Sequence, residues 1–148
     1  MCLRTYQAAL LVAVKWFLIS LNPAQAGLSG CDDLSHIDET PMVDFTSEIQ
    51  PIFNNNCIQC HGPPDPIAFM DLTLGHEHLI KVPSFQFSEI NRIEPGDAAF
   101  SYLFLKLNCG SQLSGDRMPR EAPPLSLQDQ ALIRDWIKQL LIFKSGFE

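Results

Sequence analysis

The stretch Cys57-Ile58-Gln59-Cys60-His61 is the part of this sequence around which the rest is organised. Two thiols three positions apart, followed at once by an imidazole, form the C-x-x-C-H pattern that attaches a c-type haem. Each thiol adds across one vinyl group of the haem to give a thioether, and a single helical turn spaces the two sulfurs for one macrocycle. We therefore expect one covalent haem c. His61 should be an axial iron ligand whose other ring nitrogen is held by a backbone carbonyl or water.

Two other kinds of site also use closely spaced cysteines. A C-x-x-C redox pair belongs in a strand-helix-strand setting, and no such pattern surrounds this stretch. A zinc site needs two further Cys or His side chains at paired spacing. The remaining cysteines beyond the N-terminal segment, Cys31 and Cys109, lie far apart in the sequence. The motif therefore favours haem, attached through Cys57 and Cys60.

Residues 1–26 have the features of a secretory signal peptide. Arg4 supplies positive charge, an apolar segment follows, and the segment ends in the small-x-small sequence Ala24-Gln25-Ala26. No later run approaches the ~18 apolar residues that a membrane span needs. The sequence thus predicts export to the periplasm or another extracytoplasmic compartment, where haem is attached covalently in bacteria.

The two other cysteines of the exported chain allow two interpretations. In an oxidising compartment, Cys31 and Cys109 would form a disulfide that ties the N-terminal extension to the domain. However, Leu28-Ser29-Gly30-Cys31 is also similar to the lipobox of bacterial lipoproteins, in which the cysteine becomes an acylated N-terminus. Membrane anchoring through Cys31 would leave Cys109 unpaired. The sequence leaves both possibilities open.

The exported chain is strongly acidic. The leader holds two of the ten Lys and Arg residues and none of the 17 Asp and Glu residues, so the remainder carries a formal charge of −9. This charge argues against nucleic acid or anionic lipid as a partner and favours redox proteins with basic docking surfaces. The same acidity would also serve simply to keep an exported protein soluble.

The second axial ligand of the iron is expected to be Met118. This residue lies in a polar, proline-rich loop, where a role in core packing is less natural, and Pro119 restricts its backbone to extended conformations. Met70 lies among apolar neighbours, which is more typical of a core methionine. His76 and His78 are an alternative as sixth ligand, but on a helix they would point to different faces.

The N-terminal part of the exported chain is expected to be an acidic arm followed by a helix. Residues 27–44 are polar and acidic without periodicity, which is typical of a surface arm or a linker. A helix should run from about Glu48 to Asn56, with Ser47 and Gln50 as a capping-box pair. It would lead directly into the cysteine motif.

Two further helices are expected nearer the C-terminus. The first covers residues 98–107, and its apolar side chains should line the haem crevice or the core behind it. These side chains are Phe100, Leu103, Phe104 and Leu107. The second opens at Ser126 as N-cap and continues to about Phe143. Its apolar stripe consists of Leu132, Ile133, Trp136, Ile137 and Leu140.

Taken together, these elements resemble the monohaem class I cytochrome c family, and among its members the planctomycete-type cytochrome c domain. The resemblance covers about residues 45–142. The stretches that carry it are Ile49-Gln50-Pro51-Ile52-Phe53, Cys57-Ile58-Gln59-Cys60-His61-Gly62, Leu72-Thr73-Leu74, Val82-Pro83-Ser84, Ile93-Glu94-Pro95-Gly96-Asp97, Gly115-Asp116-Arg117-Met118-Pro119, Pro123-Pro124-Leu125-Ser126 and Ile133-Arg134-Asp135-Trp136-Ile137.

The resemblance implies an all-α class I cytochrome c fold over residues 45–148, with N- and C-terminal helices crossing around a haem ligated by His61 and Met118. It implies an electron-transfer protein rather than an enzyme. The sequence departs from the family pattern in the acidic arm, in the two nearby histidines at positions 76 and 78, and at residues 120–122, just after Met118 and Pro119.

We therefore expect an exported cytochrome that carries single electrons between periplasmic or membrane redox partners. Phe100, Phe104 and Leu107 are the expected apolar wall of its haem site. The alternative is a haem-binding subunit of a larger oxidoreductase complex, or a small-ligand haem sensor with an open sixth position.

Overall fold

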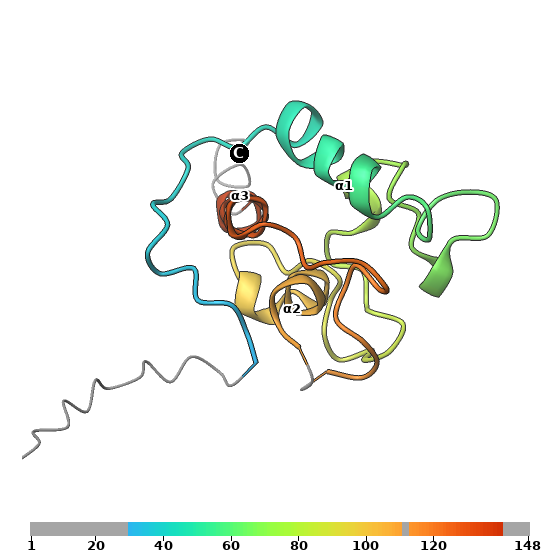
Figure 1. Cartoon of the computed structure of the whole chain (residues 1–148). Helices are drawn as coiled ribbons and strands as arrows, with labels where there is room; N and C mark the ends of the chain where they lie inside the picture. Colours follow the sequence, from blue (N-terminus) through green and yellow to red (C-terminus); the bar gives the residue numbers. More distant parts are fainter. Residues whose placement is uncertain (1–29, 111–112, 141–148) are drawn as a thin grey trace, which may run out of the picture.

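The computed structural model describes residues 30–110 and 113–140. In these two ranges the regular structure is helical, and pairing between extended segments is limited to isolated bridges. The all-α class is therefore confirmed for this part of the chain (Figure 1). The predicted leader, residues 1–26, and the end of the predicted last helix lie outside the described residues.

Seven helical elements follow one another in the described ranges. They are η1 (Phe45–Ile49), α1 (Gln50–Asn56), η2 (Ile67–Phe69), η3 (His76–His78), η4 (Ala98–Phe100), α2 (Tyr102–Asn108) and α3 (Leu127–Gln139). Only the three α-helices exceed five residues. The other residues of the described ranges form loops, so the positions of most site residues depend on how these loops are held.

The first helical segment begins earlier than the sequence predicts, at Phe45. Asp44 is its cap, because the carboxylate accepts a hydrogen bond of 2.7 Å from the amide of Ser47. Glu48 reaches back and accepts the Asp44 amide at 2.7 Å. The reciprocal arrangement of a capping box is therefore made by Asp44 and Glu48, and the prediction that Ser47 and Gln50 form it was wrong. The wide π-turn η1 precedes α1.

The N-terminal helical segment packs against α3 through η1. Figure 1 shows α1 lying crosswise to α3, which is seen along its axis. The rings of Phe45 and Trp136 lie 5.1 Å apart between centroids, and Ile49, Ile133 and Ile137 are fully buried. Burial of these side chains supplies most of the favourable free energy of such a contact. The contact directs α1 away from α3 and toward the cysteine motif.

Helix α3 starts as the sequence predicts. The Ser126 hydroxyl accepts a hydrogen bond of 3.0 Å from the amide of Asp129, so Ser126 is the N-cap. The predicted stripe faces inward, with Ile133, Trp136 and Ile137 buried.

The predicted helix 98–107 is divided in two. Ser101 is fully buried, and its hydroxyl accepts from the Glu94 amide at 2.8 Å and donates to the Asp97 carbonyl at 2.7 Å. This residue ends η4 and adopts an extended conformation before α2. The break puts Phe100 out of register, and its side chain is 66% exposed. The prediction that Phe100 lines a crevice was therefore wrong.

The acidic arm packs against α3 rather than extending from it. Figure 1 shows residues 30–44 passing around one side of α3. Leu34 and Val43 are buried in the core. Arg134 donates to the Leu34 carbonyl at 2.8 Å. Gln139 donates to the Thr40 carbonyl at 2.6 Å and accepts from the Val43 amide at 2.7 Å. The arm is thus an integral part of the packed structure.

Cys31 and Cys109 lie at disulfide distance, with the two sulfurs 2.05 Å apart. The backbone is paired on both sides, because the Asp32 amide donates to the Asn108 carbonyl at 3.0 Å and the Gly110 amide donates to the Gly30 carbonyl. The arm is therefore joined to the end of α2 as well as to α3. A sulfur in a disulfide does not also carry a lipid, so the two interpretations of Cys31 are mutually exclusive.

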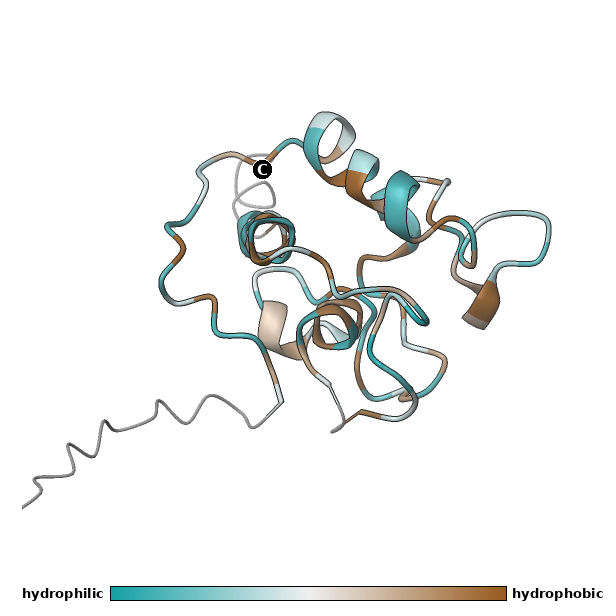
Figure 2. Cartoon of the chain, in the orientation of Figure 1, coloured by the Kyte–Doolittle hydropathy of each residue, from teal (hydrophilic) through white to brown (hydrophobic). Residues whose placement is uncertain are grey.

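Figure 2 colours each residue by its hydropathy, and brown, apolar segments occur on the parts of the helices that face one another. The short element η2 is an exception, because Ile67 is 57% exposed and Phe69 is 77% exposed at the edge of the molecule. Within residues 30–110 and 113–140, no helix has both the length and the apolar character that crossing a bilayer requires.

Replacing Leu34 with alanine tests whether the arm belongs to the core. Leu34 is 7% exposed, and loss of its buried methyl groups should lower the free energy of unfolding by about 2–5 kcal/mol. Met42→Ala is the control in the same arm, because Met42 is 84% exposed. Its effect should stay within about 0.5 kcal/mol. Denaturant unfolding of both variants provides the measurement, and equal effects would show that the arm is a loose appendage.

Candidate functional site

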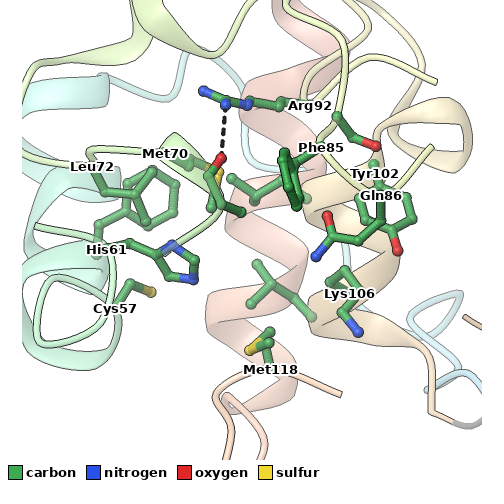
Figure 3. A pocket seen from close by; sticks show the side chains of 15 residues that line it. Cys57, His61, Met70, Leu72, Phe85, Gln86, Arg92, Tyr102, Lys106 and Met118 are labelled. Atoms are coloured by element: carbon green, nitrogen blue, oxygen red, sulfur yellow. Dashed lines mark hydrogen bonds between the residues drawn. The ribbon is translucent and has the colours of Figure 1, made fainter. Parts of the chain in front are cut away.

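A mostly apolar pocket opens between α1, α2 and three loops. Its cavity volume is about 70 Å³, and the pocket is partly open to solvent. Its apolar walls come from Phe53, Leu72, Leu103 and Leu107. Figure 3 shows that Cys57 and His61, from the cysteine motif, and Met118, from a distant segment, meet at this pocket.

The cysteine motif forms the turn that ends α1. Cys57 is the C-cap, and its carbonyl accepts hydrogen bonds from the amides of Cys60 at 3.1 Å and His61 at 2.9 Å. The motif is thus one compact turn, as the sequence predicts. A side chain at Gly62 would bring its Cβ within 2.6 Å of the Ile58 carbonyl oxygen. Only glycine fits there, so Gly62 allows the loop to leave the turn.

His61 is half-buried and points into the pocket (Figure 3). Its Nδ1 lies 3.0 Å from the carbonyl oxygen of Ile67. The carbonyl only accepts, so Nδ1 carries the proton and Nε2 keeps its lone pair. Burial is the main cause that lowers the pKa of His61, and this also favours the neutral ring. The backbone carbonyl that we expected to hold this ring is therefore present, and His61 has the tautomer of a metal ligand through Nε2.

The two cysteines of the motif differ in their surroundings. Cys57 lines the pocket, and burial raises the pKa of its thiol to about 11, with a smaller contribution from Cys60. Cys60 is exposed and does not belong to the pocket lining in this structure. Both thiols are unpaired with other cysteines among the described residues. The thiol of Cys57 thus remains protonated near neutral pH.

Two methionines line the pocket, Met118 and Met70. Met118 comes from the loop after α2, and its amide donates to the Lys106 carbonyl at 2.8 Å. Met70 lies at the end of η2, on the segment that also supplies the carbonyl partner of His61. The two methionines approach from different segments, and sequence reasoning considered both as ligands while preferring Met118.

The two nearby histidines do not reach the pocket. His76 packs against the ring of Phe45, with 4.7 Å between centroids, and lies 6.2 Å from the Trp136 ring. His78 is exposed at the end of η3. Neither lines the pocket that contains His61. Among residues 30–110 and 113–140, no three His, Cys, Asp or Glu side chains gather in a group that could bind a metal ion.

Polar donors that the sequence analysis did not identify lie in the same pocket. The Tyr102 side chain is 4% exposed, and its hydroxyl has no hydrogen-bond partner among the described residues. Lys106 is 7% exposed on the same face of α2, four residues further on. Arg92 lines the pocket from another loop and donates to the Ala68 carbonyl at 3.1 Å, dashed in Figure 3. The i, i+4 spacing of Tyr102 and Lys106 was the sequence feature that could have indicated two polar side chains on one face of a helix.

The position of Arg92 depends on a loop that doubles back between η3 and η4. The Arg92 amide donates to the Val82 carbonyl at 2.7 Å, and the Ile93 amide donates to the Leu79 carbonyl at 3.1 Å. Leu79 and Ile93 are fully buried beneath this pairing. The burial of Arg92 lowers the pKa of its guanidinium group. A cation in this place provides a favourable partner for an anionic group bound in the pocket.

Comparisons of the chain with protein-family models, curated proteins and solved structures gave no match.

The raised pKa of Cys57 gives a direct chemical prediction for the haem-free chain. In a Cys60→Ser variant, alkylation of Cys57 at pH 8 should be slow, because roughly one thousandth of a thiol with this pKa is ionised. The rate should rise as the pH approaches about 11. In urea the same thiol should react like an ordinary cysteine. Mass spectrometry of the alkylated chain gives the rates, and equal rates in the folded and unfolded states would contradict the burial of Cys57.

Proposed function

We propose that this chain is an exported monohaem c-type cytochrome that carries single electrons between redox proteins, and that it has the class I cytochrome c fold. The observation that carries the proposal is the state of His61. Its Nδ1 donates to the Ile67 carbonyl, so Nε2 presents a lone pair to a pocket that Cys57 and Met118 also line. A bound haem would supply an iron that accepts and releases one electron.

The residues of the pocket fit a haem in chemical type. Cys57 in the pocket and Cys60, which is exposed outside its lining, would form the two thioethers, and His61 and Met118 would be the axial ligands. The apolar walls suit the face of a porphyrin. The unpartnered hydroxyl of Tyr102 provides a donor for the carboxylates that the haem carries.

The raised pKa of Cys57 favours a haem attachment site over a dithiol redox site. A reactive C-x-x-C pair needs a thiol with a lowered pKa, as found at the N-terminus of a helix. Here the motif lies at the C-terminal end of α1, and burial raises the pKa of Cys57. The protonated thiol is the form whose S–H adds across a vinyl group. A zinc ligand would also require the thiolate.

The pocket walls favour the reduced state of a bound iron. A thioether ligand such as Met118 stabilises ferrous iron more than a second imidazole does, and apolar walls act in the same direction. Leu103 and Leu107 provide such walls, whereas Phe104 is buried without lining the pocket. The two axial side chains would fill both open positions of the iron, so the site supports electron transfer rather than catalysis on a bound substrate.

The proposed partners and location follow from the sequence. The signal-like residues 1–26 support a periplasmic or other extracytoplasmic location, and the acidic exported chain supports docking with redox proteins that present Lys and Arg. The pairing of Cys31 with Cys109 supports a disulfide in an oxidising compartment. It argues against a lipid anchor on Cys31. Nucleic acid is not expected as a partner.

Substitution of the two pocket methionines tests the axial ligation. In a host that matures c-type cytochromes, Met118→Ala should abolish the weak far-red absorption band of methionine bound to ferric iron and lower the midpoint potential. Met70→Ala is the matched control, because Met70 lines the same pocket, and it should keep the band. Loss of the band in Met70→Ala alone would reassign the ligand.

The attachment of haem has its own control. After denaturation and removal of free haem, the wild-type protein should remain coloured, and the double variant Cys57→Ser/Cys60→Ser should be colourless. Colourless wild-type protein would overturn the proposed function. Rapid binding of carbon monoxide to the unaltered ferrous protein would favour a ligand sensor with an open sixth position.

A further inference from the structure

Residues 114–118, which we term the ligand loop, are held to α2 by buried polar contacts. The Met118 amide donates to the Lys106 carbonyl at 2.8 Å, and Arg117 Nε donates to the Leu107 carbonyl at 2.7 Å. The buried Lys106 ammonium donates to the Ser114 carbonyl at 3.0 Å and also to the Asp116 carbonyl. The helix therefore fixes one side of the ligand loop.

The opposite side of the ligand loop is held by the N-terminal arm. The Asp32 carboxylate pairs with the guanidinium of Arg117, the residue directly before Met118. Gln130, from α3, donates to the same carboxylate at 2.8 Å. The Arg117 head thus lies between a carboxylate of the arm and a carbonyl of α2.

Asp32 is itself held rigidly in place. Its amide donates to the Asn108 carbonyl at 3.0 Å, and the Asn108 side chain donates back to the Asp32 carbonyl at 3.0 Å. Asn108 also donates to Gln130 at 3.0 Å within the core. The neighbouring Cys31 is bonded to Cys109 at the end of α2. The carboxylate is consequently fixed relative to α2 and α3 before it contacts Arg117.

The ion pair of Arg117 and Asp32 is largely shielded from solvent. The side chains of Arg117 and Asp32 are 20% and 31% exposed. The Arg117 contact is the largest cause that lowers the pKa of Asp32, so the carboxylate is ionised at neutral pH. Removing the negative charge would leave a half-buried guanidinium without its counter-ion, which is costly. Arg117 would then turn toward solvent and displace the backbone of the next residue.

We propose that Asp32 is a positioning residue for Met118: the arm acts through Arg117 to hold the thioether over the pocket. This inference rests on the proposed haem ligation by Met118. The arm, which is absent from the pattern of the resembling family, then contributes to the iron site through Arg117. Its disulfide with Cys109 and its contact with Asn108 fix the point from which Asp32 acts.

The test compares Asp32→Asn with Glu39→Gln in the haem-loaded protein. Glu39 also belongs to the arm and pairs with Lys138 of α3, but it does not touch the ligand loop. In Asp32→Asn, imidazole should displace the methionine ligand about tenfold faster, a change that corresponds to ~1.4 kcal/mol. The midpoint potential should fall, and the Met118 amide should exchange its hydrogen faster. Glu39→Gln should match the wild type in all three measurements.

Two further variants separate positioning from a general loss of stability. Ile133→Val removes a methylene from a fully buried residue of α3 and should lower the unfolding free energy without changing imidazole displacement. Asp32→Glu keeps the carboxylate and should restore part of the wild-type rate. The double variant Cys31→Ser/Cys109→Ser should change the rate in the same direction as Asp32→Asn.

The outcomes distinguish the inference from the function on which it rests. Wild-type protein with methionine-ligated haem and an Asp32→Asn variant with unchanged displacement and potential would overturn the role of Asp32 alone. It would also be overturned if Ile133→Val and Asp32→Asn, at equal losses of unfolding free energy, changed imidazole displacement and midpoint potential to the same extent. Wild-type protein without covalent haem would overturn both proposals.

Discussion

The packing of η1 on α3 is the contact on which the rest of the structure depends. Because Asp44 starts the helix early, Phe45 reaches the Trp136 ring. That contact fixes the direction of α1, and the direction of α1 determines where Cys57 and His61 enter the pocket. A helix of only seven residues has little stability of its own. The position of the motif is therefore determined by tertiary packing between two segments that lie far apart in the sequence.

The pocket combines features that a folded chain tolerates poorly without a ligand. An apolar cavity lacks the close packing of a protein interior, and the buried Tyr102 hydroxyl lacks a partner among the described residues. A domain of about 100 residues also has a modest core. A large apolar group with carboxylates at its edge would offset all three deficits. The proposed haem would thus serve as a structural component of the domain as well as its redox centre.

Sequence reasoning succeeded where a feature depends on neighbouring residues. The Ser126 cap and the carbonyl that holds His61 are of this kind. It failed where the outcome depends on distant contacts: the buried Ser101 hydroxyl interrupts a helical pattern and exposes Phe100. The arm was expected to be peripheral because its two core residues are nine positions apart and follow no helical or strand period. Tyr102 and Lys106 share α2 at i, i+4 spacing, but Arg92 comes from another loop, so no single stretch reveals all the donors of the pocket.

The contacts between α3 and the arm determine which residues of each segment tolerate substitution. Arg134 and Gln139 bond to carbonyl and amide groups of the arm backbone rather than to its side chains. Every residue except proline offers the same backbone groups, so most exposed positions of the arm could accept new side chains, including probes or affinity handles. Arg134 and Gln139 have no such freedom. The arm therefore tolerates substitution at its exposed positions, whereas the residues of α3 that hold its backbone do not.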